Sequence, residues 1–432
     1  MRLNAKTKLE NNRSVNQRIT TMNLHVRTFI YAALLFGSTL SLQAQDSKPA
    51  LNFFTRKGRG FGVVTGDSTF SLNFQFRMQN RAAFVSKSEN ELDPESFEFR
   101  VRRLRFKFEG FVYNPKLTYY IQLSFSRGDM DWRGTDNSVV NSSPNAVRDA
   151  VIYYSPTKNL RLGFGQTKLP GNRQRVISSG DQQFADRSIV NAAFNIDRDF
   201  GFFAHWTASN FVILRGALTS GEGRNSVSSN NGLAYTGRIE ILPFGKFTGN
   251  NDYIEGDLER EPTPKVSLAT TYSFNDRAVR QAGQLGNDLY QARGIKNFEV
   301  DALFKYNGWA WYNEYMERDT DNPVTVNAAA ATRYIYVGKG YLSQLSYLFK
   351  NNVEIAARYS ATVPLSSLYE NANFPAVSEK QLEQVEFGIT KYLAGHRLKV
   401  QGNLIHGNRT NLVDDSYDGG FWSAIFQIEL GI

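Results

Sequence analysis

Basic side chains concentrate at alternating positions in the stretch FEFRVRRLRFKFEG, residues 97–110, and in the segment just before it. The planar guanidinium group of arginine binds oxyanions through two parallel hydrogen bonds and keeps its charge when buried. A row of such groups on a wall of low dielectric constant raises the local concentration of phosphate, carboxylates and other anions. The residues in question are Arg77, Arg81, Arg100, Arg102, Arg103, Arg105 and Lys107.

A simpler interpretation of these residues stays open. Polar side chains are required wherever a strand faces water, and the arginines could be neutralised by Glu98, Glu109 and acidic residues of neighbouring strands. In that case the row would have no preference for a particular ion.

A second group of charges lies in residues 169–198, a segment too long to serve only as a connection. If the segment folds inward, its charges define the narrowest point of a channel; as a plain outer loop they would be solvated. Four arginines against three aspartates favour anions slightly, and Lys168 lies just outside, so no lysine cluster is evident. The charged residues are Arg173, Arg175, Asp181, Asp186, Arg187, Asp197 and Arg198.

Catalysis is disfavoured by the residue types available. The chain has no cysteine, which removes disulfides, cysteine-ligated zinc and thiol chemistry together. Beyond the leader described below, the histidines are His205, His396 and His406, and no serine motif lies near them. We therefore expect no catalytic residues, no metal site and no cofactor.

The elements that carry the charges are predicted to be strands, because apolar and polar residues alternate along most of the chain. From Phe70 the even positions are apolar and the odd ones polar. In the next segment the alternation slips by one at Arg102 and Arg103, which predicts a β-bulge. Sixteen segments fit the chain: three that start near residues 70, 97 and 117, then 147–154, 160–168, 200–208, 210–219, 233–242, 265–274, 297–306, 309–317, 333–348, 352–361, 381–392, 397–406 and 420–432.

The connections alternate between short and long, as in transmembrane barrels with short turns on the periplasmic side and long loops outside. Asn307-Gly308 is typical of the short class, whereas residues 169–198 and 275–294 belong to the long one. Residues 243–264 are long where a short turn is expected, and the sequence alone does not explain them.

The first 44 residues resemble a targeting segment. A basic stretch up to Arg27 precedes an apolar core from Phe29 to Leu42, and cleavage is expected after Ala44; Met22 is a plausible true start. The apolar core is too short for a spanning helix. The leader carries six basic residues and one acidic one, so the formal charge of +9 falls to +4 without it, which argues against a nucleic-acid partner.

Together these features predict an all-β protein, a transmembrane antiparallel barrel in residues 45–432, in the bacterial outer membrane with lipid around it. The mean hydropathy of −0.41 and the absence of a long apolar run after the leader argue against spanning helices. A soluble sandwich would also show alternation, but it would not combine a leader, 58 aromatic residues and loops of two length classes. No plug domain precedes the first expected strand, which disfavours an energy-coupled receptor.

The order of several stretches resembles the phosphate-selective porin O and P family. They are FEFRVRRLRFKFEG at 97–110, LRLGFGQTKLP at 160–170, RDFGFF at 198–203, YTGRIEILPFG at 235–245, VDALFKYNGWAWYNEY at 300–315 and IAARYS at 355–360. The resemblance implies a 16-stranded barrel, commonly a trimer, with arginine-rich pore walls and an inward-folded third loop, here residues 169–198. It also implies passive uptake of small anions, phosphate among them; a weakly selective general porin, and a non-channel barrel acting as adhesin or scaffold, are the alternatives.

Overall fold

The computed structural model describes residues 50–55, 60–126, 146–227, 232–374, 379–412 and 414–432, and every structural statement below refers to these ranges. The predicted leader, residues 1–44, lies outside them. None of the described helices is long and apolar enough to cross a membrane.

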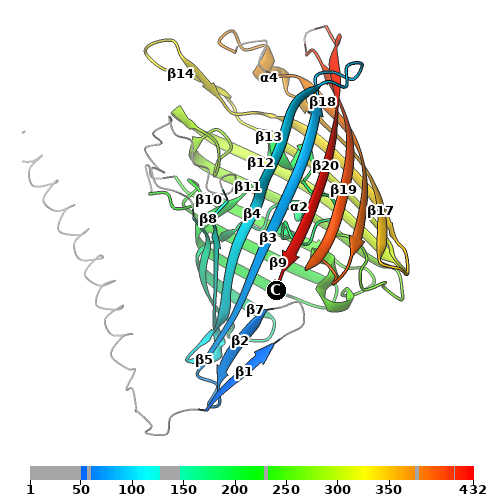
Figure 1. Cartoon of the computed structure of the whole chain (residues 1–432). Coiled ribbons are helices and arrows are strands. Elements are labelled where there is room, and N and C mark those ends of the chain that lie inside the picture. The colour runs from blue at the N-terminus through cyan, green and yellow to red at the C-terminus, as the bar shows by residue number, and fades with distance from the viewer. Residues whose placement is uncertain (1–49, 56–59, 127–145, 228–231, 375–378, 413) are drawn as a thin grey trace, which may run out of the picture. The chain divides into compact units, whose positions relative to one another are not determined.

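Sixteen antiparallel strands form a closed barrel, which confirms the predicted fold class and strand number (Figure 1). Each strand pairs with the next along the chain, and β20 closes the ring by pairing with β3 from Gly431–Arg77 to Ser423–Val85. The strands are β3 (Phe70–Ser86), β4 (Pro94–Val112), β5 (Asn114–Ser124), β6 (Val147–Tyr154), β7 (Leu160–Lys168), β8 (Arg198–Thr207), β9 (Val212–Thr219), β10 (Ala234–Ile241), β11 (Lys265–Arg280), β12 (Asp288–Tyr306), β13 (Trp309–Asp319), β16 (Gly338–Leu348), β17 (Val353–Pro364), β18 (Gln381–Tyr392), β19 (Leu398–Thr410) and β20 (Tyr417–Gly431).

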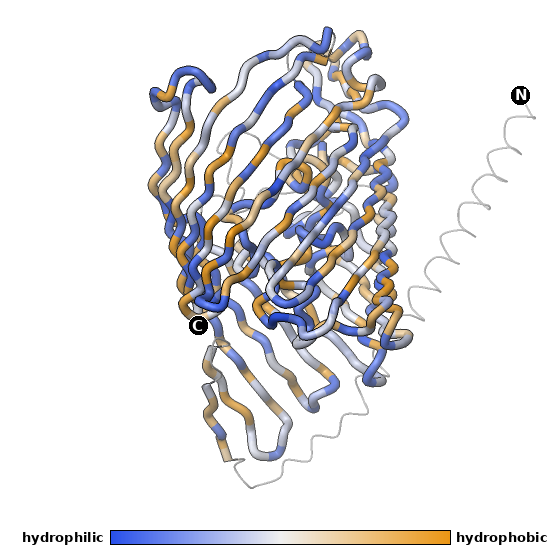
Figure 2. The backbone as a smooth tube through the Cα atoms, turned by 90° about the vertical axis from the view of Figure 1, so that its right-hand side faces the viewer, coloured by the Kyte–Doolittle hydropathy of each residue, from blue (hydrophilic) through white to orange (hydrophobic). Residues whose placement is uncertain are grey.

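The alternation in the sequence becomes two chemically different faces. In β10 the outward Tyr235, Ile239 and Ile241 are exposed, whereas Arg238 and Glu240 point inward and are buried. Figure 2 shows the same alternation of apolar and polar residues along many strands. An apolar outer face suits lipid, and a polar inner face suits a water-filled lumen.

The turn between β12 and β13 shows how the sequence sets the strand register. Asn307 and Gly308 both have positive φ, 46° and 91°, the backbone conformation that a two-residue hairpin of this twist requires. The hairpin then pairs Tyr306 with Trp309 and continues in register to Lys296 and Asp319. We call this end of the barrel, which carries the short connections, the turn end, and the opposite one the loop end.

Some boundaries differ from the prediction. Residues 275–294, expected as a loop, are mostly strand, because β11 continues to Arg280 and β12 begins at Asp288. A hairpin of β1 (Leu51–Thr55) and β2 (Phe61–Thr65) was not predicted. Strand β2 pairs with the first residues of β3, just before the part of β3 that pairs with β20. A second small hairpin, β14 (Val324–Val326) with β15 (Thr332–Tyr334), and helix α4 (Ser366–Tyr369) belong to the loop end.

Candidate functional site: an arginine-lined cavity in the barrel

The segment that follows β7 folds into the barrel, as predicted, and we call residues 169–197 the constriction loop. It contains the short helices α2 (Arg173–Val176) and α3 (Ile189–Phe194). The hydroxyl of Ser188 caps α3 by accepting a hydrogen bond from the Asn191 amide, 3.1 Å away. Val190 and Phe194 of α3 belong to one buried apolar cluster with residues of the barrel wall, so burial of apolar surface fixes this end of the loop.

The middle of the loop passes close to β3 and β20. Ser178 and Ser179 accept hydrogen bonds from the Arg77 guanidinium at 3.1 and 2.7 Å. A β-carbon at Gly180 would lie 2.0 Å from Nη1 of Arg77, so a side chain at this position would displace the Arg77 guanidinium. The loop therefore crosses the lumen and leaves free space on the side of β4 to β8.

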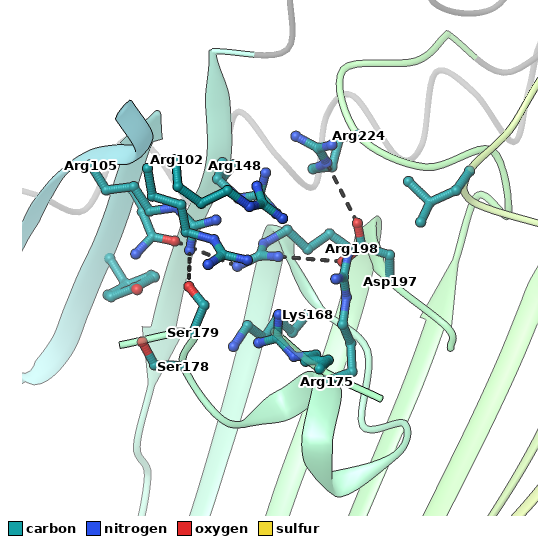
Figure 3. Close-up of a pocket in the computed structure, with 15 residues that line it drawn as sticks. Arg102, Arg105, Arg148, Lys168, Arg175, Ser178, Ser179, Asp197, Arg198 and Arg224 are labelled. Carbon is teal, nitrogen blue, oxygen red and sulfur yellow. Dashed lines mark hydrogen bonds and ion pairs between the residues drawn. The ribbon is translucent and has the colours of Figure 1, made fainter. Parts of the chain in front are cut away.

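That free space is a polar cavity of about 230 Å³. Eight arginines and one lysine line it, against a single carboxylate, Asp197. Figure 3 shows guanidinium groups from β4, from the start of β6 and from the start of β8 converging on the same space, with Ser178 and Ser179 at its edge. The lining residues are Arg102, Arg103, Arg105, Tyr120, Gln122, Arg148, Lys168, Arg175, Ser178, Ser179, Arg187, Asp197, Arg198, Arg224 and Leu285.

Two β-bulges add arginines to this wall. On β4, Arg103 pairs with Gln79 and Val101 with Asn80, so Arg102 is the extra residue, which confirms the predicted slip. On β6, Asp149 pairs with Gln122 while Val147 pairs with Leu123, and the extra residue is Arg148. Both bulge residues line the cavity, although the strict alternation of a strand would turn one of two adjacent side chains toward lipid.

Three aspartates hold the arginines in place and compensate part of their charge. Asp197 pairs with Arg175 at 2.6 Å and with Arg198 at 3.3 Å, and Asp149 pairs with Arg198 at 3.0 Å. Although burial acts to raise it, the neighbouring guanidinium groups hold the pKa of Asp197 well below its ordinary value. The same balance, with Arg81 as the main partner at 2.5 Å, lowers the pKa of Asp186.

The cavity remains strongly positive after this pairing. Burial, followed by repulsion from Arg175 and Arg105, lowers the pKa of Arg187 well below its ordinary value. Because arginine does not lose its proton in proteins, this shift means that the charged group lies in an unfavourable field. The Nε atom of Arg102 is buried with no hydrogen-bond partner among the described residues. An anion in the cavity would relieve the repulsion and supply an acceptor.

The structure places only some of the predicted site residues in this cavity: Arg102, Arg103, Arg105, Arg175, Arg187, Asp197 and Arg198. Arg198 is the first residue of β8 rather than part of the loop. Arg77, Lys107 and Asp181 line an adjoining cavity of about 120 Å³, which shares Arg105 with the first.

Four predicted residues line neither cavity. Arg100 lies on the inward face of β4, opposite Arg81, but it is half-exposed and pairs with Glu98 of its own strand at 2.6 Å. Arg81 and Asp186 pair with each other at 2.5 Å, and the Arg81 side chain is buried. Arg173 was expected at the constriction, yet it is fully buried behind the loop, where its Nε lies 2.6 Å from Asp301; it anchors α2 to β12.

Arg148, Lys168 and Arg224 also line the cavity, although they were not predicted from the sequence. Arg148 sits at a position that alternation assigns to the lipid face, and the bulge on β6 is not visible in the residue pattern. Lys168 was noticed only as lying outside the loop. Arg224 comes from the distant segment between β9 and β10, and no local signal links it to β4.

Among the described residues, no group of three histidine, aspartate or glutamate side chains is placed to hold a metal ion. A comparison of the sequence with curated proteins gave no match.

Comparisons with solved structures identify porins as structural neighbours. The anion-selective porin from Comamonas acidovorans superposes with a TM-score of 0.52 at 10% identity, over 84% of this chain and all of that one. OmpF of Salmonella typhi, in complex with daunomycin, gives 0.51 at 14% identity over 85% and 99% of the two chains. The channel DcaP of Acinetobacter baumannii gives 0.51 at 12% identity over 84% and 97%. At these identities the likeness shows a shared fold.

The sequence also matches a family profile, described as phosphate-selective porin O and P, over residues 72–372. This range covers most of the barrel, from β3 to the segment after α4. Fold and family are those of a channel rather than an enzyme. The chain therefore belongs to the phosphate-selective porin O and P family and is an outer-membrane channel of bacteria.

Proposed function

We propose that this channel passes small anions, and that oxyanions such as phosphate bind transiently in the arginine-lined cavity. The observation that carries the proposal is the excess of cationic over anionic side chains in a space of about 230 Å³, nine against one. A volume of this size accommodates a small oxyanion with part of its hydration shell, but not a large solute.

The chemistry of the wall suits tetrahedral oxyanions. Guanidinium groups donate pairs of hydrogen bonds in a plane, and Ser178, Tyr120 and Gln122 add neutral polar groups at the same wall. Because the cations come from four strands, the constriction loop and the β9–β10 connection, an anion could move between several partners without leaving the field. Binding that is favourable but spread over several sites permits conduction.

Selectivity is tested by measuring the reversal potential of the purified protein in a planar bilayer across a KCl gradient, followed by addition of phosphate. We expect anion selectivity and block of the chloride current by phosphate. Weak or cation selectivity without block would contradict the proposal and leave a general porin, and a protein without conductance would point to an adhesin or scaffold.

Three further expectations stay proposals. The turn end faces the periplasm, the chain assembles as a homotrimer in outer-membrane lipid, and residues 1–44 are removed as a leader. Native mass spectrometry of the detergent-solubilised protein would give the number of subunits. The mass of the same subunit would show whether the chain starts at Gln45.

A further inference from the structure

The long connection between β10 and β11 occupies the inside of the barrel. It lies at the turn end, where the other connections are short, and it contains the 3₁₀ helix η1 (Thr248–Tyr253). Asn251, Asp257 and Glu261 are fully buried, so this is not a solvated turn. We call residues 247–261 the wedge.

The wedge is fixed to the barrel wall by hydrogen bonds to its backbone. The buried Nζ of Lys305 on β12 donates to the carbonyl oxygens of Asn251 and Ile254, at 2.5 and 2.7 Å. Asp257 accepts from the backbone amide of Gly308 at 2.8 Å, in the turn between β12 and β13. These contacts hold the wedge against the wall opposite the arginine-lined cavity.

The wedge also holds the constriction loop directly, and Glu255 is the centre of this contact. Its backbone amide donates to the carbonyl oxygen of Asp181 at 2.8 Å, and its carboxylate accepts from the amide of Gln183 at 2.9 Å. Its own carbonyl oxygen lies 3.0 Å from Nε2 of His396, which must donate because a carbonyl can only accept. Lys399 lies 3.1 Å from the other ring nitrogen of His396 and also donates to the loop carbonyls of Gly180 and Gln182.

Little space is left where loop, wedge and wall meet. The remaining cavity there has a volume of about 10 Å³, and residues from all three elements line it, among them Gln183, Glu255 and Leu303. This is room for one water molecule at most. The cavity on the other side of the loop is about 230 Å³. Among the described residues, the loop therefore leaves far more space on the side of the arginines than on the side of the wedge.

The charge of the wedge also favours the passage of anions on the side of the arginines. It contains five acidic residues and one arginine. The buried carboxylates of Glu255, Asp257 and Glu261 accept hydrogen bonds from backbone amides, such as that of Glu261 to Asp257 at 3.0 Å. This side of the lumen is thus closed by an acidic segment, and the open side is basic.

We propose that the wedge is a determinant of selectivity: it props the constriction loop from the turn end and confines permeating anions to the arginine-lined side. The part that concerns anions rests on the proposed function above, whereas the blocking of the other half of the lumen does not.

The test replaces residues 247–261 by the dipeptide Asn-Gly and compares the variant with the unaltered protein in planar bilayers. Because conductance grows with open cross-section, we expect it to rise at least about twofold, with a fall in anion selectivity. Lys305→Met, which removes the anchor to the carbonyl oxygens of Asn251 and Ile254 and to the Asn251 side chain, should shift both quantities in the same direction by less. Deletion of residues 328–330, at the exposed tip of the β14–β15 hairpin, is the control and should change neither.

A second readout does not depend on selectivity. The chain has no cysteine, so a single Leu303→Cys substitution gives one thiol beneath the wedge. A charged methanethiosulfonate reagent should leave it unmodified in the otherwise unaltered barrel and modify it when the wedge is replaced. Heat-modifiable mobility in gel electrophoresis would show that both proteins are folded.

Unchanged conductance together with an unreactive thiol in the folded wedge variant would overturn the inference. If the unaltered channel is anion-selective in that case, the proposed function stands and only the wedge is wrong. If instead the unaltered channel lacks anion selectivity but the wedge variant gains conductance and thiol reactivity, the proposed function fails and the blocking role of the wedge stands.

Discussion

Replacing Arg105 by glutamine is the most informative single change, because this residue lines both cavities of the pore wall. Its Nη1 donates to Oγ of Ser179 on the constriction loop at 2.8 Å, so the side chain lies at the proposed path of the anions past this loop. Glutamine keeps a polar amide but is shorter, so the substitution removes the charge together with the hydrogen bond to Ser179. We expect Arg105→Gln to fold normally and to bind phosphate less tightly.

The size of the effect follows from the distance between the anion and the charge. An oxyanion that accepts a hydrogen bond from Arg105 has its centre roughly 4 Å from the charge of the guanidinium group. Loss of one unit charge at this distance costs about 1 kcal/mol in a fully aqueous environment and about 4 kcal/mol at an effective dielectric constant near 20. Even the lower bound is about a fivefold change in affinity.

The assay is titration of the chloride current with phosphate, which gives the concentration for half block. Arg100→Gln is the matched control: it removes the same charge from the same strand, but Arg100 pairs with Glu98 outside the cavity. We expect less than a twofold effect from the control. Equal effects of the two variants, or none from Arg105→Gln, would refute the claim that the cavity is where phosphate binds.

Three other predictions follow from the same contacts. Arg148→Gln, at the bulge of β6, should weaken phosphate block several-fold, whereas Arg161→Gln, whose guanidinium stacks on Tyr153 at 3.6 Å outside the cavity, should not. Arg173→Met removes one of the two buried guanidinium partners of Asp301, and Arg238 remains at 2.6 Å; the variant should lower the temperature of the heat-modifiable transition, at a cost in stability below the about 3–5 kcal/mol of a fully unpaired buried charge. The arginines hold the pKa values of Asp186 and Asp197 below that of an unfolded aspartate, about 3.9, so their contribution is complete above that pH and is lost only as the pH falls through the lower folded values. The two aspartates should therefore cause no transition in chloride selectivity between pH 8 and pH 5, and a transition in this range that depends on either aspartate would contradict the pairing described here.

The fold could be predicted from the sequence because every second residue of a transmembrane barrel strand faces lipid and the residues between them face the lumen. Outward residues such as Tyr235, Ile239 and Ile241 must be apolar, and their neighbours polar, so strand number and order can be counted directly. Strands cannot be recognised from this alternation where they extend beyond the lipid. The end of β11 and the start of β12, from Asn275 to Ile295, have polar residues on both faces and resemble a loop, although they are paired.

The site was predicted only in part, for two physical reasons. At a β-bulge the alternation no longer predicts which way a side chain points. Arg102 was found because the apolar pattern shifts by one residue beside it, whereas nothing in the pattern marks Arg148. Partner choice is also a long-range property. Arg173 and Arg175 are two residues apart in one loop, yet one pairs with Asp301 behind the loop and the other with Asp197 at the cavity. Only the path of the loop through the barrel decides between these roles.

The most direct measurement is to locate the anion. Crystals of the purified protein soaked with selenate, a tetrahedral oxyanion like phosphate, would give anomalous density for the selenium. We predict a peak inside the arginine-lined cavity, within hydrogen-bonding distance of Arg105 and its neighbours, that disappears when phosphate is present in excess. Selenate bound only at other positions, with the cavity holding nothing but water, would contradict the account.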